Sequence, residues 1–368
     1  MSSLELVTKY HIAKQIFNEY NVEKIINSPK QENYRNKINL SFGLFNGKKD
    51  VGSLQKNFSV IPAKLNNKAS IISIKICEFM RDWVNSNSKL DIINNTDFSG
   101  FWRHITIHNN RLHHVMIIFH IQNLDKHQDT WILEFTDLKF KLSKFIESNN
   151  YFLNSIYYQN SNTKKETRNT DAYHLIYGEK SFIEVLDNYK FNISPGSFFQ
   201  VNSDTAEIIY NKIKSLVDGD DKVILDLCCG TGTIGCFLDK NAKKVYSIDY
   251  SKKNCYDAEI NRYMNNCMNQ IIIHGKIEEC VPKLIKTINI TDNIILIINP
   301  PRKGLDKKIA LFIKKLFHVK QIIYISCNIK TLDRDLNIMN LKSSIKNIIP
   351  INQFPNTNHL ELIINIVR

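Results

Sequence analysis

The chain has 368 residues, 43% of them hydrophobic and 23% charged, with a formal net charge of +13. This length allows two domains, and no run of about 18 apolar residues occurs, which excludes a membrane-spanning helix. The basic charge suits a polyanionic partner such as nucleic acid, although an AT-rich genome also enriches Lys. Acidic residues at Glu5, Glu19 and Glu23 argue against a transit peptide, so we expect a cytoplasmic or nuclear protein.

Residues 1–190 are expected to form an α+β region that binds the substrate. Alternating apolar residues predict antiparallel strands at Phe101–Ile107 and Val115–Ile121. Helices are predicted at Ile71–Ser86 and Thr136–Ser148, and the polar segment Asn160–Ala172 is predicted to be a surface loop.

Residues 191–368 show a different pattern, in which short apolar strands alternate with helical stretches. This alternation predicts a Rossmann-like, doubly wound and mostly parallel sheet. Ligands of such sheets bind at the carboxyl ends of the strands, where the unusual residues of this half lie. The predicted strands are Val223–Leu225, Lys244–Ile248, Ile271–Ile273, Ile294–Ile298 and Gln321–Ile325.

The eight cysteines include no C-x-x-C pair, so we expect neither a zinc site nor an iron–sulfur site. Seven of them follow residue 227, mostly in apolar or helical contexts. Most are therefore expected to be structural thiols in a reducing compartment.

The turn after Val223–Leu225 reads DLCCGTGTIG, from Asp226 to Gly235. Its glycines allow a ligand to approach the backbone, and its place between a strand and a helix is typical of a cofactor loop. Asp249 ends the next strand, where it can accept hydrogen bonds from two ribose hydroxyls or serve as a helix N-cap. The early acid Asp226 suits a cofactor with an amino-acid end better than a dinucleotide. Glu278 is a candidate for the adenine side, or an exposed acid at a helix start.

Two further strand ends carry candidate catalytic groups. The sequence NPPR, from Asn299 to Arg302, follows one strand, and its prolines make a rigid turn that can hold a flat base. Amino-group methyltransferases also use Asn-Pro-Pro, but they follow it with an aromatic residue. Cys327 ends the last predicted strand. A free cysteine is most often core filler, but this position favours a nucleophile.

Six segments, taken together, resemble the uracil-C5 RNA methyltransferases. They are YRNK from Tyr34, ISPGSFFQVN from Ile193, DLCCGTGTIG, NPPRKGL, YISCN and QFPNTNHLE. The likeness is closest to the eukaryotic tRNA (uracil-5-)-methyltransferase homologues A and B, and it extends to the bacterial tRNA enzyme. It implies S-adenosyl-L-methionine as cofactor and tRNA, at its T-loop uridine, as substrate. The cofactor residues expected from it and from the glycine loop are Gln200, Cys228, Gly230, Thr233, Asp249 and Asn299.

The resemblance also implies a covalent mechanism with Cys327 as nucleophile and Glu361 as base. A thiolate that adds to C6 of uracil activates C5, and a base must then remove the C5 proton. Arg302 is a candidate for favouring the ionised thiol. The target base must leave its stack, so residues 1–190 are expected to grip RNA. The candidate contacts, which would otherwise be a half-buried Trp and solvated cations, are Tyr34, Arg35, Lys37, Trp102, Arg103 and Arg111.

Three asparagines stand where the family commonly has acids: Asn39, Asn299 and Asn352. Asn299 removes a negative charge beside the cationic sulfonium, which can reduce activity. Two alternatives therefore stay open, an RNA-binding tRNA-folding helper with weak or no methyl transfer and a methyltransferase that acts on ribosomal RNA. A monomer is the default expectation for the assembly.

Overall fold

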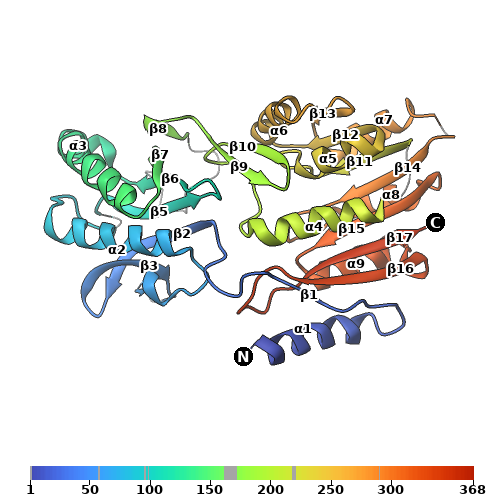
Figure 1. Ribbon diagram of the computed structural model, residues 1–368, viewed down its shortest axis with the longest axis horizontal. Coiled ribbons are helices and arrows are strands. Elements are labelled where there is room, and N and C mark those ends of the chain that lie inside the picture. The colour runs from blue at the N-terminus through green and yellow to red at the C-terminus, as the bar shows by residue number, and fades with distance from the viewer. Residues whose placement is uncertain are drawn as a thin grey trace. The chain divides into compact units, whose positions relative to one another are not determined.

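The protein was analysed as a computed structural model, which describes residues 2–56, 59–94, 97, 99–160, 172–217, 221–289 and 291–368. The chain forms two compact units, drawn in Figure 1. Unit 1 contains Met1–Gln31, Leu186–Asn192 and Ser197–Arg368, and unit 2 contains Glu32–Val185 and Ile193–Gly196. The two units therefore differ from the expected division at residue 190, because unit 1 also includes the N-terminal residues 1–31. Residues 1–31 join unit 1 because Ala13 and Phe17 are part of its core.

Unit 1 is built on an eight-stranded sheet in the order β1-β16-β17-β15-β14-β11-β12-β13. All neighbouring strands are parallel except β17, which is antiparallel to both β15 and β16. The predicted mostly parallel, Rossmann-like sheet is thus confirmed. Its strands are β1 (Ile26–Asn27), β11 (Lys222–Leu227), β12 (Ala242–Asp249), β13 (Gln270–His274), β14 (Asn293–Ile298), β15 (Val319–Ser326), β16 (Ile345–Asn352) and β17 (Glu361–Val367).

Helices cover both faces of this sheet (Figure 1). The face that carries Leu225, Leu296 and Tyr324 packs against α1 (Ser2–Ile16), α7 (Ile277–Ile285), α8 (Lys307–Lys314) and α9 (Ile329–Met339). The helices α4 (Ser203–Leu216), α5 (Thr233–Leu238) and α6 (Lys252–Met264) contact one another on the other face. In β14, residues 294–298 are all apolar and buried because helices cover both faces of the sheet.

Side-chain caps fix where the helices that follow the strands begin. Asn202, Ser251, Asp306 and Asn328 each accept a hydrogen bond from a backbone N–H in the first turn of their helix. Ser251, and not Asp249, is therefore the N-cap of α6. This leaves the carboxylate of Asp249 available for other contacts.

Unit 2 has a seven-stranded sheet in the order β4-β3-β2-β5-β6-β7-β8. The predicted antiparallel pair is confirmed as β5 and β6, but β6 and β7 are parallel because α3 connects them. That helix begins at Leu124, earlier than the predicted Thr136. The elements are β2 (Lys37–Phe45), β3 (Lys48–Leu54), β4 (Val60–Pro62), α2 (Ile71–Ser86), β5 (Trp102–Asn109), β6 (His114–Ile121), α3 (Leu124–Ser148), β7 (Phe152–Asn160) and β8 (His174–Gly178).

The remaining described elements are short. The hairpin of β9 (Phe182–Leu186) and β10 (Tyr189–Ile193) spans the boundary between the units along the chain, and three 3₁₀ turns lie at Ala63–Leu65, Asp239–Asn241 and Lys342–Ser344. Most of the predicted loop at residues 160–172 lies outside the described residues. Within the described part of the chain, no helix is long and apolar enough to cross a membrane.

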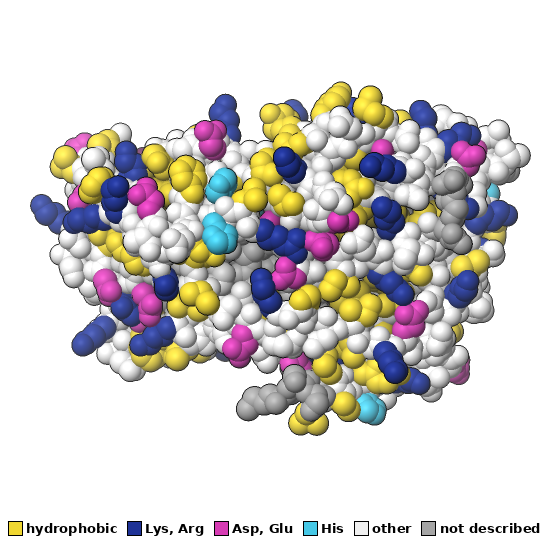
Figure 2. Space-filling model, in the orientation of Figure 1, with side chains coloured by type: hydrophobic (Ala, Val, Ile, Leu, Met, Phe, Trp, Pro, Cys, Tyr) yellow, Lys and Arg dark blue, Asp and Glu magenta, His cyan; other side chains and the backbone are white. Residues whose placement is uncertain are grey.

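The cations of the chain do not gather on one spot of the face drawn in Figure 2. Lys and Arg side chains are scattered over it, with Asp and Glu side chains among them. The net charge of +13 therefore does not by itself locate a nucleic-acid surface.

Candidate functional site

The register of the unit 1 sheet brings the candidate residues to one edge. Leu227 pairs with Ile248 on one side and with Ile298 on the other, so the next residues, Cys228, Asp249 and Asn299, are neighbours. Further along the same edge, Ser326 pairs with Leu362. Cys327 directly follows Ser326 along the chain, and Glu361 directly precedes Leu362. Because β17 is antiparallel to β15, both residues lie at the same edge of the sheet. The five candidates thus lie on adjacent strands, as expected for a parallel sheet.

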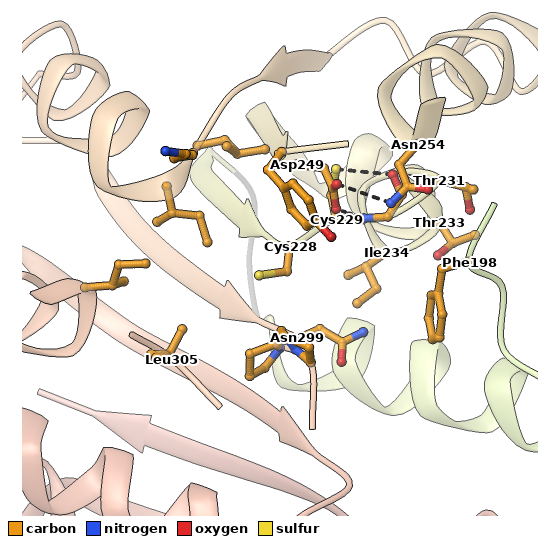
Figure 3. Close-up of a pocket in the computed structure, with 18 of the residues that line it drawn as sticks. Phe198, Cys228, Cys229, Thr231, Thr233, Ile234, Asp249, Asn254, Asn299 and Leu305 are labelled. Carbon is orange, nitrogen blue, oxygen red and sulfur yellow. Dashed lines mark hydrogen bonds between the residues drawn. The ribbon is translucent and has the colours of Figure 1, made fainter. Parts of the chain in front are cut away.

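A cavity of about 600 Å³ opens at the β12–β11–β14 part of this edge. Its volume lies within the range of small-molecule sites, roughly 300–1,000 Å³. Figure 3 shows a hydrogen bond between Asp249 and Asn254 at one side of it, with Cys228 and Asn299 after the neighbouring strands. Cys327 and Glu361 are not among its lining residues. The residues that line the cavity include Phe198, Gln200, Tyr210, Cys228, Gly230, Thr233, Asp249, Tyr250, Asn254, Ile277, Glu278 and Asn299.

Fixed donors hold the carboxylate of Asp249 in the cavity wall. Its Oδ2 accepts from the N–H of Gly230 at 3.0 Å, and its Oδ1 accepts from the N–H of Ser251 at 2.8 Å and from Asn254 Nδ2 at 3.2 Å. A carboxylate has about four acceptor sites, so one remains. That site suits a ribose hydroxyl. A cofactor with a ribose therefore fits this wall.

The last glycine of the loop, Gly235, packs against buried side chains and does not line the cavity. A Cβ there would lie 2.1 Å from Gln270 Nε2 and 2.7 Å from Ser247 Oγ, so any side chain would displace both groups. The expectation for Asp226 is wrong, however. This side chain is 0% exposed, lies beneath the loop, hydrogen-bonds with Ser247 and does not line the cavity. Burial, together with the negative charge of nearby Asp249, raises the pKa of Asp226 to about 7.

Two hydrogen-bonded pairs connect the cavity to residues that sequence analysis did not select. Gln200 accepts from Gln353 Nε2 at 2.7 Å. Thr233 donates to the hydroxyl of Tyr210 at 3.4 Å, and burial raises the pKa of Tyr210 to about 12, so its hydroxyl stays protonated. Gln353 lies within the quoted QFPNTNHLE motif, which was the available signal. Tyr210 lies inside α4 and gives no such signal.

Cys327, Glu361 and Arg302 form the second part of the edge. Burial, and next the charge of Glu361, raise the pKa of the half-buried Cys327 thiol, whereas the nearby Arg302 guanidinium lowers it. Burial also raises the pKa of Glu361 to about 8, again against the effect of Arg302. Ionisation of the thiol or of the carboxyl in this enclosed site therefore depends on the cation.

A buried network shapes the loop that carries Arg302. Asp335, which is 0% exposed, accepts from Tyr324 Oη and from the N–H of Leu305, each at 2.7 Å. A Cβ on Gly304 would lie 2.5 Å from the same carboxylate, and φ at Gly304 is +74°, so a side chain is excluded there. Asn328 also donates to the carbonyl oxygen of Arg302 at 3.1 Å. The turn after Asn299 is thus tied to α9.

The structure buries some of the RNA contacts expected in unit 2 and leaves others at least partly exposed. Trp102 is 0% exposed, packs against the rings of Phe42, Trp83 and Trp131, and donates to Ser88 at 3.2 Å. It has no face on which a base could stack, so its prediction as an RNA contact is wrong. Tyr34 and Arg103 are also buried, at 5% and 7% exposed, so their side chains offer little surface to RNA. Arg35, Lys37 and Arg111 are at least partly exposed and remain predictions.

The described residues hold no group of three or more His, Cys, Asp or Glu side chains that could bind a metal ion. At the sheet edge, Asp249 accepts from backbone and amide N–H groups.

Comparisons with known proteins agree with this architecture. A family-wide sequence profile described as tRNA (Uracil-5-)-methyltransferase matches residues 3–368. An uncharacterized RNA methyltransferase of Fusobacterium nucleatum subsp. nucleatum is 34% identical over 334 residues, which cover 90% of this chain and 69% of that protein. The tRNA (uracil-5-)-methyltransferase homolog B of Danio rerio is 30% identical over 291 residues, which cover 73% of this chain and 58% of that protein.

A solved structure shares the fold of the whole chain. It is the Pyrococcus abyssi tRNA (uracil-54, C5)-methyltransferase in complex with S-adenosyl-L-homocysteine. The TM-score is 0.76 at 24% identity, and the match covers 99% of this chain and 83% of that one. At this identity the likeness shows the fold alone.

Proposed function

Because the chain belongs to the tRNA (uracil-5-)-methyltransferase family, whose cofactor is S-adenosylmethionine, we propose that it methylates C5 of a uridine in RNA, namely the T-loop uridine of tRNA. One observation carries the proposal. A thiol, a carboxyl and a guanidinium, those of Cys327, Glu361 and Arg302, interact at one part of a sheet edge whose other part forms a cavity.

Cys327 acts first in the proposed mechanism. Its thiolate adds to C6 of the uracil ring, which forms an S–C6 bond and moves the electron pair of the C5–C6 double bond into an enolate. C5 becomes a carbon nucleophile in this way. The guanidinium of Arg302, which lowers the pKa of the thiol, increases the thiolate fraction.

Glu361 acts in the second half. As a carboxylate it takes the proton from C5, after which the electron pair restores the C5–C6 double bond and the sulfur of Cys327 leaves C6. Burial raises the pKa of Glu361 to about 8, so it accepts this proton readily once ionised. Its neighbour Arg302 stabilises the ionised form.

The cavity holds the cofactor, which when bound supplies an electrophilic methyl group. Asp249 would accept from a ribose hydroxyl, Glu278 and Ile277 would line the adenine side, and Gln200 and Thr233 would contact the amino-acid end. Phe198 and Pro300 would restrict the access of water. These side chains orient the methyl group toward the part of the edge that carries Cys327.

The most specific element of the proposed function is the target nucleotide. The uracil must leave its stack to reach Cys327, which favours a loop nucleotide. The Danio rerio relative is named for tRNA, and the Pyrococcus abyssi enzyme for uracil-54 of tRNA. We therefore favour tRNA over ribosomal RNA.

The test is to incubate unmodified tRNA with labelled cofactor and the wild type, Cys327→Ala or Cys280→Ala, and to map the product. We expect 5-methyluridine in the T-loop with the wild type and with Cys280→Ala, a control thiol on α7. We expect a loss of at least about 10⁴-fold with Cys327→Ala.

Each other outcome would overturn a defined part of the proposal. Activity of Cys327→Ala would point to an amino-group methyltransferase. Methylation of a ribosomal fragment and not of tRNA would change the substrate. Binding of tRNA without any 5-methyluridine would favour a tRNA-folding helper and contradict methyl transfer.

A further inference from the structure

A buried lysine lies next to the loop that leads to Glu361. This loop, residues 353–360, connects β16 to β17. Lys9 of α1 is 3% exposed, and its Nζ donates to Asn352 Oδ1 at 2.6 Å, to the carbonyl oxygen of Phe354 at 3.0 Å and to Glu5 Oε1 at 2.6 Å. These three acceptors use all three N–H groups of the ammonium.

The N-terminal segment holds the loop at further points. Glu5 accepts from the N–H of Asn356 at 3.1 Å, and Asn356 Nδ2 donates to the carbonyl oxygen of Gln31 at 2.9 Å. Asn352 Nδ2 donates to Asn27 Oδ1 at 2.9 Å. Asn352 thus accepts from Lys9 and donates to Asn27 at once, which a carboxylate cannot do. This is a physical reason for an amide where the family commonly has an acid.

The same loop reaches both parts of the functional edge. Gln353 donates to Gln200 at 2.7 Å, and Asn202 Nδ2 donates to the carbonyl oxygen of Gln353 at 2.9 Å. At its other end the loop enters β17 at Glu361, which pairs with Ile351. A displacement of the loop therefore changes both the lining of the cavity and the carboxyl beside Cys327.

Attachment of α1 alone does not require a buried ammonium. Ala13 and Phe17 of the same segment already pack into the core of unit 1. Burial lowers the pKa of Lys9, partly offset by its hydrogen bond to Glu5, so the charged form is retained at a cost. What Lys9 adds is directional: it binds two specific oxygens, one before and one within the loop.

We propose that Lys9 is a positioning residue for the active site, which holds residues 353–360 so that Gln353 meets Gln200 and Glu361 faces Cys327. The inference rests on the proposed function for its catalytic consequence. It makes Lys9, remote in sequence from every catalytic residue, a part of the machinery for methyl transfer.

The kinetic test compares Lys9→Met, Lys9→Arg and Lys14→Met in the full chain with tRNA and cofactor. Lys14 is an exposed lysine on the same helix, with its Nζ 5.9 Å from the ring centre of Tyr10. Misplacement by an ångström costs up to about 10²-fold, so we expect kcat of Lys9→Met to fall by about 10- to 100-fold. Because proton removal by Glu361 is slowed, the fraction of protein covalently bound to RNA on a denaturing gel should rise.

Lys9→Arg should restore most of kcat, and Lys14→Met should match the wild type. A Lys9→Met protein with wild-type kcat and adduct fraction, measured well below its melting temperature, would overturn the proposal even if it were less stable. The proposal would also be overturned if Lys9→Met and Lys9→Arg had equally lowered melting temperatures and neither lost kcat.

A second measurement separates this inference from the proposed function. Hydrogen exchange of the free protein should show faster exchange of the amides in residues 353–361 in Lys9→Met, and no such change in Lys14→Met. Unchanged exchange would refute the positioning role whatever the activity. If the wild type makes no 5-methyluridine but exchange accelerates as expected, the proposed function fails and the structural role of Lys9 stands.

Discussion

Two parts of the unit 1 sheet edge are built in different ways. The cofactor end, defined by Cys228, Asp249 and Asn299, draws on backbone donors and a glycine loop, and Asp249 is fixed by three hydrogen bonds. The thiol end, defined by Cys327, Glu361 and Arg302, consists of ionisable side chains, and burial raises the pKa of both acids there.

In the proposed mechanism, this difference separates cofactor binding from the chemical steps. Fixed N–H donors leave Asp249 an acceptor of defined geometry, which is what recognition of a neutral hydroxyl requires. In the proposed reaction, a proton is removed and a sulfur–carbon bond forms and breaks at the thiol end. The enclosed acids there lie near the cation Arg302, so their protonation is sensitive to what binds. Substitutions at the thiol end should therefore lower kcat, and substitutions at the cofactor end should change cofactor affinity.

The largest expected effect is at the thiol end. Glu361→Gln keeps the shape of the side chain but cannot take the C5 proton, so kcat should fall by about 10²–10⁴-fold. The methylated RNA should remain attached to Cys327, and the adduct is measured on a denaturing gel. Cofactor affinity should stay as in the wild type. Rapid turnover by Glu361→Gln would remove Glu361 from the mechanism.

The next effect is at the cofactor end. Asp249→Asn replaces a charged acceptor by a weaker one, so cofactor affinity should fall by about 10- to 100-fold. Calorimetry should give the same loss for S-adenosylmethionine and for S-adenosyl-L-homocysteine, since both carry the ribose. At saturating cofactor, kcat should recover. A loss of kcat that saturation does not relieve would break the separation between the two ends.

A smaller effect on affinity separates recognition of the charge of the cofactor from recognition of its shape. Asn299→Asp adds a negative charge to the cavity wall, so affinity for the sulfonium cofactor should rise by about threefold. S-adenosyl-L-homocysteine has no such cation, and its binding is the matched control, expected to stay constant or weaken. Equal gains for both ligands would mean that Asn299 does not sense the sulfonium.

The last prediction concerns the pH dependence of stability. The pKa of Glu361 is raised by burial from 4.5 to about 8, so the folded protein binds this proton more tightly than the unfolded chain does. The resulting stabilisation is complete below about pH 4.5 and is lost as the pH rises through about 8. The free energy of unfolding of the wild type, relative to that of Glu361→Gln, should thus fall between about pH 4.5 and about pH 8. Denaturant unfolding at several pH values measures this difference. A constant difference would indicate that Glu361 is not enclosed.

Much of unit 1 could be predicted from its sequence. The strands β11, β14 and β15 were found within a few residues because apolar runs bounded by turn residues are local signals. The position of Cys327 after a strand follows from the same pattern. Asp226 was misplaced, because both a cavity-facing acid and a buried acid fit the same sequence. Only the surrounding side chains decide which way it points.

The sequence by itself therefore determined the alternation of strands and helices, the glycine loop and the order of residues along the edge, all of which depend on neighbours along the chain. The tertiary structure alone decided that Trp102 is core rather than surface, that residues 1–31 belong with unit 1, and that Lys9 binds the loop before Glu361. Each of these rests on contacts between residues far apart in the chain, and burial and hydrogen bonding over such separations leave no periodic signal in the sequence.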